Sequence, residues 1–87
     1  MAKKKTRTIS EAKIKTVMKL IETEFRSASA KHDALHTPHE GWALLLEEVD
    51  ELWVEVKKKP KSRSVGLMAG EAVQVGAMAA RFIYDFM

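Results

Sequence analysis

The sequence predicts an all-α protein built from three helices, and three observations support this fold class. Apolar residues recur every three or four positions over long stretches, which is typical of amphipathic helices. Helix-capping residues stand before these stretches, most clearly Thr37 with Pro38. The sequence shows neither the alternating pattern of a β-strand nor an internal repeat. We therefore expect one helical domain over residues 10–87.

Residues 1–9 are basic and are predicted to form a flexible arm. Contact with phosphates or nucleic acid is one interpretation of this arm, and a solvated terminus is the one that we favour. No apolar stretch follows the arm, so it does not resemble a signal peptide.

The first helix is predicted to begin after Ser10, which can cap it. Its apolar stripe is formed by Ile14, Val17, Met18, Ile21, Phe25 and Ala28. From Ser27 to His36 the helical period is lost, which indicates the end of the helix and a connection.

The second helix should begin with the capping box Thr37-Pro38-His39-Glu40 and run to about Lys58. Pro60 then stops it within a basic loop over residues 57–63. The third helix is predicted from Ser62 or Ser64 to the C-terminus. It contains Gly66, Gly70 and Gly76. Each interior glycine costs about 1 kcal/mol relative to alanine, so we expect a neighbouring helix to approach closely there.

A chain of 87 residues without cysteine has few ways to become stable. A domain of this size buries only about 60–65% of the surface that its unfolded chain exposes, and no disulfide can compensate. We therefore expect a homodimer or tetramer. The missing cysteines fit a reducing, cytoplasmic location. The apolar stretch from Val65 to Ala80 is too short to span a membrane, so we expect no membrane partner.

The net charge of +3 hides an uneven distribution. Residues 37–58 hold six acids and two bases, a balance of −4, so the remainder carries +7. An acidic site in a basic surround suits a metal-bound polyphosphate. Nucleic acid is not expected as a partner, because the acidic helix would repel it.

The acids of the second helix gather on one side. At 100° per residue, an arc of about 100° holds Glu40, Glu47, Glu48, Glu51 and Glu55. A solvated surface is one interpretation, but such surfaces usually mix charge signs, whereas like charges at helical spacing repel each other. Metal binding is the other interpretation.

The third helix adds to this pattern, because Glu71 and Gln74 are the strongly polar side chains of its apolar stretch. They lie three positions apart and so project from one side. A carboxylate in such a helix needs a metal or an ion pair, for example with Arg81 or with a lysine of the first helix. Oxygen ligands from both helices favour Mg²⁺ or Mn²⁺ over zinc.

These residues resemble the motifs of the MazG-like nucleoside triphosphate pyrophosphohydrolases. That family carries Glu-Glu-x-x-Glu on one helix and Glu-x-x-Asp on a later one. Here the first motif corresponds to Glu47-Glu48-Val49-Asp50-Glu51, and the second to Glu71-Ala72-Val73-Gln74. The resemblance covers about residues 37–87, and the surrounding residues also look like those of small members from phages and mobile elements.

The resemblance implies a helical bundle, completed by dimerisation, that hydrolyses a nucleoside triphosphate to monophosphate and pyrophosphate. It implies Glu48, Glu51 and Glu71 as Mg²⁺ ligands, and Glu47 as a further ligand or as the group that orients or deprotonates the attacking water. Gln74 replaces the family's aspartate with a neutral amide oxygen, which can still coordinate a hard cation but with lower affinity. A catalytically degenerate helical module that binds nucleotide or metal is therefore the alternative function.

Three further groups of residues have competing interpretations. Lys57, Lys61 and Arg81 are candidates to bind the substrate's phosphates, although a basic loop needs no such role, and Arg81 can equally pair with a carboxylate. His32, His36 and His39 have spacings that invite zinc, but Pro38 interrupts any shared helical side. For Trp42 and Trp53 we favour packing in the core or a dimer interface over base stacking. We also assign Met18, Met68, Met78, Phe82 and Phe86 to the core.

Overall fold

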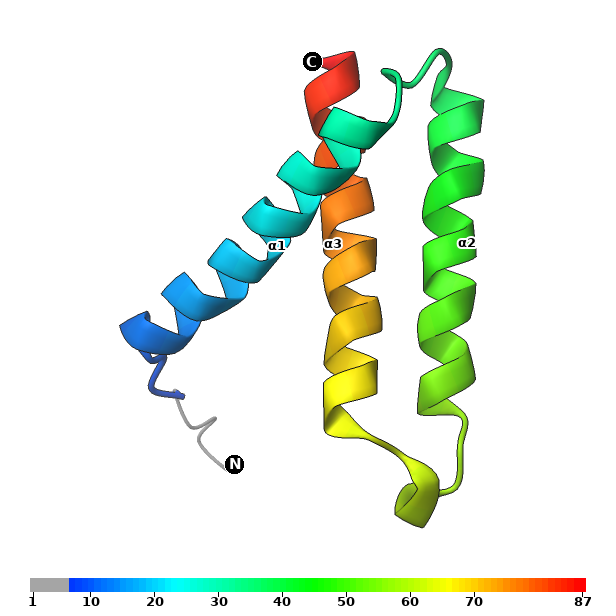
Figure 1. Cartoon of the computed structure of the whole chain (residues 1–87). Helices are drawn as coiled ribbons and strands as arrows, with labels where there is room; N and C mark the ends of the chain where they lie inside the picture. Colours follow the sequence, from blue (N-terminus) through cyan, green and yellow to red (C-terminus); the bar gives the residue numbers. More distant parts are fainter. Residues whose placement is uncertain (1–6) are drawn as a thin grey trace, which may run out of the picture.

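The computed structural model describes residues 7–87 and contains three α-helices (Figure 1). They are α1 (Glu11–Lys31), α2 (Pro38–Val56) and α3 (Val65–Phe86), and a single 3₁₀ turn, η1 (Pro60–Ser62), precedes α3. The described range holds no strand, so the predicted all-α class is confirmed. Residues 1–6 of the predicted basic arm lie outside the described residues, and residues 7–9 precede α1.

Each helix begins where a side-chain oxygen can accept a hydrogen bond from the first turn. Ser10, Thr37 and Ser64 accept from the backbone N–H groups of the residues three positions later. The predicted capping box is closed differently, because the Glu40 carboxylate accepts from the His36 N–H rather than from that of Thr37. The capped starts of α1 and α2 confirm the predicted positions, and Ser64 is the cap of α3.

Two helix ends differ from the prediction. Helix α1 continues to Lys31, so residues 27–31 are helical although the apolar period is lost there. Ser27 and Ala28 are half-buried, and small residues that fit beneath a neighbouring helix sustain α1 without an apolar stripe. Helix α2 ends at Val56, slightly before Lys58, and the Arg63 Nε–H donates to the Val56 carbonyl at 2.8 Å.

Helix α3 is central to the arrangement. It packs antiparallel beside α2 and also contacts α1, whereas α1 and α2 do not pack on each other. Figure 1 shows α1 crossing α3 near the C-terminus of the chain and diverging from it toward the N-terminus. The described helices include none that is long and apolar enough to cross a membrane.

The contact between α1 and α3 depends on a glycine. A Cβ atom at Gly76 would lie 3.1 Å from Cδ1 of Ile21, so the two helices are close at this point. Further toward the C-terminal ends of both helices, the rings of Phe25 and Tyr84 meet edge to face, with 5.6 Å between their centroids. The predicted close approach is therefore confirmed at Gly76. It is wrong for Gly66 and Gly70, because a Cβ atom at either position would have no atom of another helix within 4 Å.

The C-terminal turns of α3 hold the connection between α1 and α2. The Asp85 carboxylate accepts from the Leu35 N–H at 2.9 Å, and the Arg81 Nη2 group donates to the Asp33 carbonyl at 3.3 Å. Leu35 is buried, and Phe82 lies against Gly41 of α2. These contacts fix the start of α2 relative to α3.

The core of a single chain is very small. The buried apolar residues in the described range are Leu35, Ala77 and Met78. The core assignment is thus confirmed for Met78 and wrong for Met18 and Phe86, which are exposed. Trp42 and Trp53 are also exposed. Because α1 and α2 do not contact each other, the three helices cannot enclose the apolar side of each one.

The surface area and dimensions of the chain reflect this open packing. Its solvent-accessible area is 7352 Å², whereas a compact protein of this mass exposes about 5,200 Å². The Cα radius of gyration is 15.7 Å, and about 12 Å is typical for a compact domain of this length. One copy therefore leaves about 2,200 Å² more surface exposed than a self-contained domain would.

The two types of glycine environment make a matched test. Gly41→Ala places a Cβ within 2.6 Å of the Phe82 ring, which must move, so we expect the free energy of unfolding to fall by about 1 kcal/mol. Gly70→Ala meets nothing within 4 Å and should raise that free energy by up to about 1 kcal/mol through helix propensity. Urea unfolding at one fixed protein concentration measures both, and equal effects would contradict the packing of Phe82 on Gly41.

Candidate metal centre

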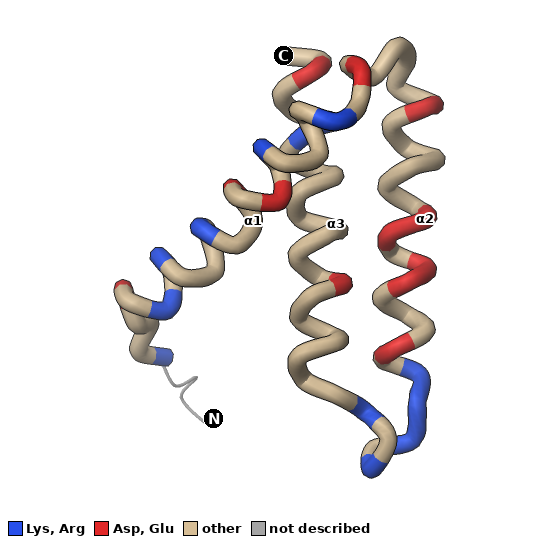
Figure 2. The backbone as a smooth tube through the Cα atoms, in the orientation of Figure 1, with Lys and Arg blue, Asp and Glu red and all other residues tan. Residues whose placement is uncertain are grey.

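Three glutamates from two helices come together in the middle of the α2–α3 pair. Glu48 and Glu51 of α2 and Glu71 of α3 each offer an oxygen atom, and these atoms all lie within 4.8 Å of one another. Within residues 7–87, no other trio of acidic, histidine or cysteine side chains comes this close. Figure 2 shows the acidic positions along α2 beside the acidic position halfway along α3. We call these three residues the glutamate cluster.

The helical register explains the cluster. Glu48 and Glu51 lie about one turn apart on α2, and the antiparallel packing of α3 sets Glu71 opposite them. Glu48 and Glu71 are half-buried, whereas Glu51 is exposed. The cluster is thus backed by protein on one side and open to solvent on the other.

Burial and like charges together disfavour the ionised form of Glu48. Partial burial contributes most to raising the pKa of Glu48 above its ordinary value. The charge of Glu51, a hydrogen bond with Glu51, and the charges of Glu71 and Glu47 raise this pKa further. A bound cation would reverse these effects, because it attracts the same carboxylates that repel one another.

The donor set fits a hard divalent cation. Carboxylate oxygens are the ligands that Mg²⁺ and Mn²⁺ prefer in proteins. The exposed side of the cluster leaves room for water or phosphate oxygens, which Mg²⁺ usually retains as ligands. The cluster contains neither sulfur nor imidazole, so its chemistry favours Mg²⁺ or Mn²⁺ over zinc, as the sequence predicts.

Gln74 and Arg81 lie beside the cluster on α3. Together with Glu48 they line a cavity of about 190 Å³. Gln74 is half-buried, and it lies less than one full turn beyond Glu71, on the same side of the helix. The structure therefore brings the second predicted motif to the first, with an amide on the wall of the cavity.

Arg81 is 7% exposed, and it forms no ion pair with any described residue. Its hydrogen bonds go to the Asp33 carbonyl and, at 3.8 Å, to the sulfur of Met78. No buried side-chain nitrogen or oxygen in the described range lacks a partner, so the remaining guanidinium N–H groups must reach solvent through the cavities that Arg81 lines. The suggested ion pair between Glu71 and Arg81 is not formed.

Helix α1 contributes residues that the sequence did not point to. The same cavity is lined from α1 and its end by Glu24, Ser27, Ala28, Lys31 and His32. The four helical members recur at spacings of three, one and three, which is the pattern of one helical side. Ser27, Lys31 and His32 lie in the segment that the sequence predicts to be a connection, and Ala28 belongs to the predicted apolar stripe, so the sequence does not indicate a site on this side of α1.

The remaining predicted site residues lie further from the centre. Glu47 is exposed on α2 and acts on the cluster through its charge. Lys57 and Lys61 are exposed at the turn between α2 and α3, where Figure 2 shows the basic positions gathered. Their neighbour Lys58 pairs with Glu55, with 2.7 Å between Nζ and Oε1. His32, His36 and His39 form no metal-binding group among the described residues.

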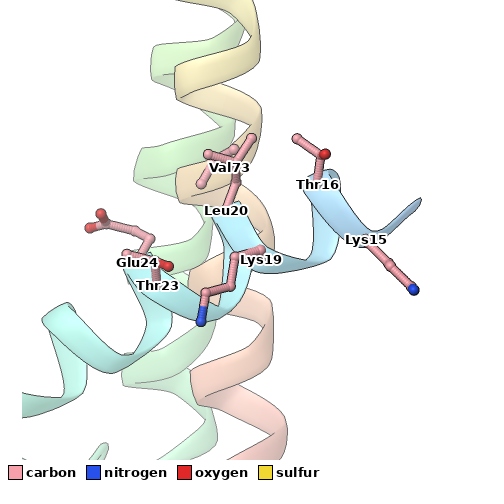
Figure 3. A pocket seen from close by; sticks show the side chains of 7 residues that line it. All are labelled: Lys15, Thr16, Lys19, Leu20, Thr23, Glu24 and Val73. Atoms are coloured by element: carbon pink, nitrogen blue, oxygen red, sulfur yellow. The ribbon is translucent and has the colours of Figure 1, made fainter. Parts of the chain in front are cut away.

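A separate hollow holds none of these predicted residues. It measures about 680 Å³ and lies in the wedge where α1 diverges from α3. Figure 3 shows the residues that line it, which come from α1, among them Leu20 and Lys19, and from α3, where Val73 lies. The wedge follows from the divergence of α1, and it does not contain the glutamate cluster.

Comparisons with protein-family models, curated proteins and solved structures find no match for this chain. The case for a function therefore depends on the geometry of the glutamate cluster and on the motifs that occupy it.

The raised pKa of Glu48 has a measurable consequence for stability. A carboxyl whose pKa is higher in the folded state stabilises the fold when protonated, and this contribution is lost as the pH rises through the folded pKa. Without divalent cations, Glu48→Gln should therefore raise the free energy of unfolding at pH 7 and change it less at pH 4. Urea unfolding at both pH values measures this difference.

Glu22→Gln is the control for this experiment. The hydrogen bond from Arg26 lowers the pKa of Glu22, so its ionised form favours folding above the unfolded pKa and that contribution is lost as the pH falls. This variant should not stabilise the protein at pH 7. A destabilising effect of Glu48→Gln at pH 7 would contradict the repulsion within the cluster.

Proposed function

We propose that this protein is a Mg²⁺-dependent nucleotide pyrophosphohydrolase that cleaves a nucleoside triphosphate to the monophosphate and pyrophosphate. The observation that carries the proposal is the convergence of Glu48, Glu51 and Glu71, with oxygens within 4.8 Å of one another, from two helices. These are the positions at which the resemblance to the MazG-like family implies metal ligands. The proposed role is the removal of non-standard nucleotides, or the adjustment of a nucleotide pool, in the cytoplasm.

Each residue of the cluster has a defined task in this proposal. Glu48, Glu51 and Glu71 hold the cation, and Gln74 adds a neutral amide oxygen. Bound Mg²⁺ polarises the phosphoryl group and lowers the pKa of a bound water. Glu47, which is exposed beside Glu48, orients or deprotonates the attacking water.

Cationic side chains around the cluster are proposed to bind the phosphates. Arg81 presents guanidinium N–H groups to the cavity that Glu48 and Gln74 also line, and Lys31 reaches the same cavity from α1. Lys57 and Lys61 supply positive charge from the turn between α2 and α3. The active form is proposed to be a homodimer or tetramer, because one chain buries so few apolar residues.

One observation favours a second function. Gln74 lies on the cavity wall at the place where the family pattern has a carboxylate, which removes one negative charge from the site. A helical module that binds nucleotide or metal without turnover would have such a weakened site. Pyrophosphate release distinguishes the two functions, because only the enzyme produces it.

The first test is Mg²⁺-dependent release of pyrophosphate from canonical and modified nucleoside triphosphates. We expect Glu48→Ala and Glu71→Ala each to lower the rate at least about 100-fold, because each removes a ligand that orders the reacting groups. Asp50→Ala is the matched control, since Asp50 is exposed on the same helix and lies outside the cluster. The absence of release from folded protein with every substrate would refute the enzyme and leave the binding module.

The charge missing at Gln74 can be restored. Gln74→Asp should lower the dissociation constant for Mg²⁺, measured by titration calorimetry, roughly 10-fold or more, because a carboxylate replaces a neutral ligand. Without metal the same variant should be less stable than the native protein, since it adds a like charge to the cluster. An unchanged affinity would show that residue 74 does not contact the cation.

A further inference from the structure

Four large apolar residues form an exposed ridge along α2. Trp42, Leu46, Val49 and Trp53 lie within an arc of about 60° on the helix, and they are 58%, 41%, 41% and 57% exposed. We call this set the α2 seam. Its spacings of four, three and four are those of the core positions in paired helices. A monomeric protein rarely exposes a continuous row of large apolar side chains of this kind.

The seam and the glutamate cluster lie on opposite flanks of the α2–α3 pair. Around α3, Phe82 meets α2 and Tyr84 meets α1, whereas Arg81 lies between them on the side of Glu40, Leu44 and Glu48. Helical geometry places Ile83 on the other side, and Ile83 is exposed. The exposed apolar side of the helix pair therefore combines the α2 seam with Ile83 of α3.

The order of the seam residues is symmetric. Tryptophan stands at each end, and the two aliphatic residues stand in the middle, with equal spacings on both sides of the centre. A contact between identical surfaces across a two-fold axis requires each surface to match its own reversed copy. When two seams run antiparallel, Trp42 of one copy meets Trp53 of the other, and Leu46 meets Val49.

The excess surface of the chain is sufficient for such an interface. One copy exposes about 2,200 Å² more than a compact domain of its mass, and obligate homodimers bury about 2,000–5,000 Å² in total. Tryptophan is also among the residues that contribute most to binding at interfaces.

The other exposed apolar row is less suited to self-pairing. Val17, Met18 and Leu20 of α1 are exposed, but Lys13 lies on the same side of the helix, one turn before Val17. Two copies of this row would bring like charges together, which opposes association.

From these observations we propose that two copies of the chain associate through their α2 seams, antiparallel about a two-fold axis, into a four-helix core made of two α2–α3 pairs. This inference deepens the homodimer of the proposed function and does not depend on catalysis. The two glutamate clusters face away from the interface, so each remains open to substrate.

The first experiment measures self-association by sedimentation across a range of protein concentrations. The native chain should be dimeric, and Leu46→Lys should raise the dissociation constant more than about 30-fold, which corresponds to loss of a central interface contact. Val54→Lys is the matched control, because Val54 is exposed on the same helix away from the seam. A monomeric native chain, or equal effects of the two lysines, would overturn the proposal.

Fluorescence gives a second readout from the native sequence. Both tryptophans of the protein belong to the seam, so dilution below the dissociation constant should move their emission to longer wavelength. Emission that does not change while the dimer dissociates would place the interface elsewhere and overturn the proposal.

Cross-linking tests the antiparallel register with variants that keep the seam uncharged. The chain has no cysteine, so Leu46→Cys and Val49→Cys can each be prepared as the only thiol. A mixture of the two should give the mixed disulfide dimer as the main product on oxidation, since positions 46 and 49 meet across the axis. Mainly homotypic dimers would overturn the antiparallel pairing.

The assembly and the catalysis can fail separately. Glu48→Ala should remain dimeric and give the same mixed cross-link, whatever its activity. A native dimer that releases no pyrophosphate would support the seam and refute the enzyme. Activity from a chain that stays monomeric would do the reverse.

Discussion

The packing of α3 against both other helices is the constraint on which the rest of the structure depends. Helices α1 and α2 do not pack on each other, so apart from the connection between them, their relative position depends on their contacts with α3. Gly76 lets α1 approach, Phe82 lies on Gly41 of α2, and Asp85 holds the connection at Leu35. These contacts fix α3 beside α2. Glu71, the acidic residue in the apolar stretch of α3, therefore lies next to Glu48 and Glu51 of α2.

This arrangement also sets the electrostatic character of the glutamate cluster. Helix α1 covers the C-terminal end of α3 and diverges from the N-terminal half of α3 (Figure 1). The cluster is consequently half-open, and Glu48 is buried enough for its pKa to rise while solvent still reaches Glu51. A fully buried trio of carboxylates would be protonated or unstable, and a fully exposed one would have little reason to bind a cation tightly.

Much of the fold could be predicted from local signals. Ser10, Thr37 and Pro60 mark helix boundaries through chemistry within a few residues, and the resemblance of two motifs to a known family implies that Glu48, Glu51 and Glu71 share one site. What the sequence could not reveal depends on distant contacts. The helical state of residues 27–31 follows from packing between α1 and α3. That packing also decides that, of Gly66, Gly70 and Gly76, for which the sequence predicts a close approach, only Gly76 has one. The sequence likewise shows both the acidic arc and the apolar arc of α2. It does not show that α3 covers only part of the apolar arc and leaves Trp42 and Trp53 exposed.

The glutamate cluster and the α2 seam, on the two flanks of α2, both bear on the stability of the chain. Ionised Glu48 opposes folding through burial and repulsion, yet one copy has only three buried apolar residues in its described range to oppose that cost. Folding free energies are small differences between large terms, so a site of this kind needs stabilisation from outside the single chain. The proposed cation would stabilise the folded chain on one flank, and burial of the α2 seam in the proposed dimer would do so on the other. Because a cation and a second copy that bind the folded state preferentially both stabilise it, each of the two proposed binding events would raise the population of folded chain available to the other.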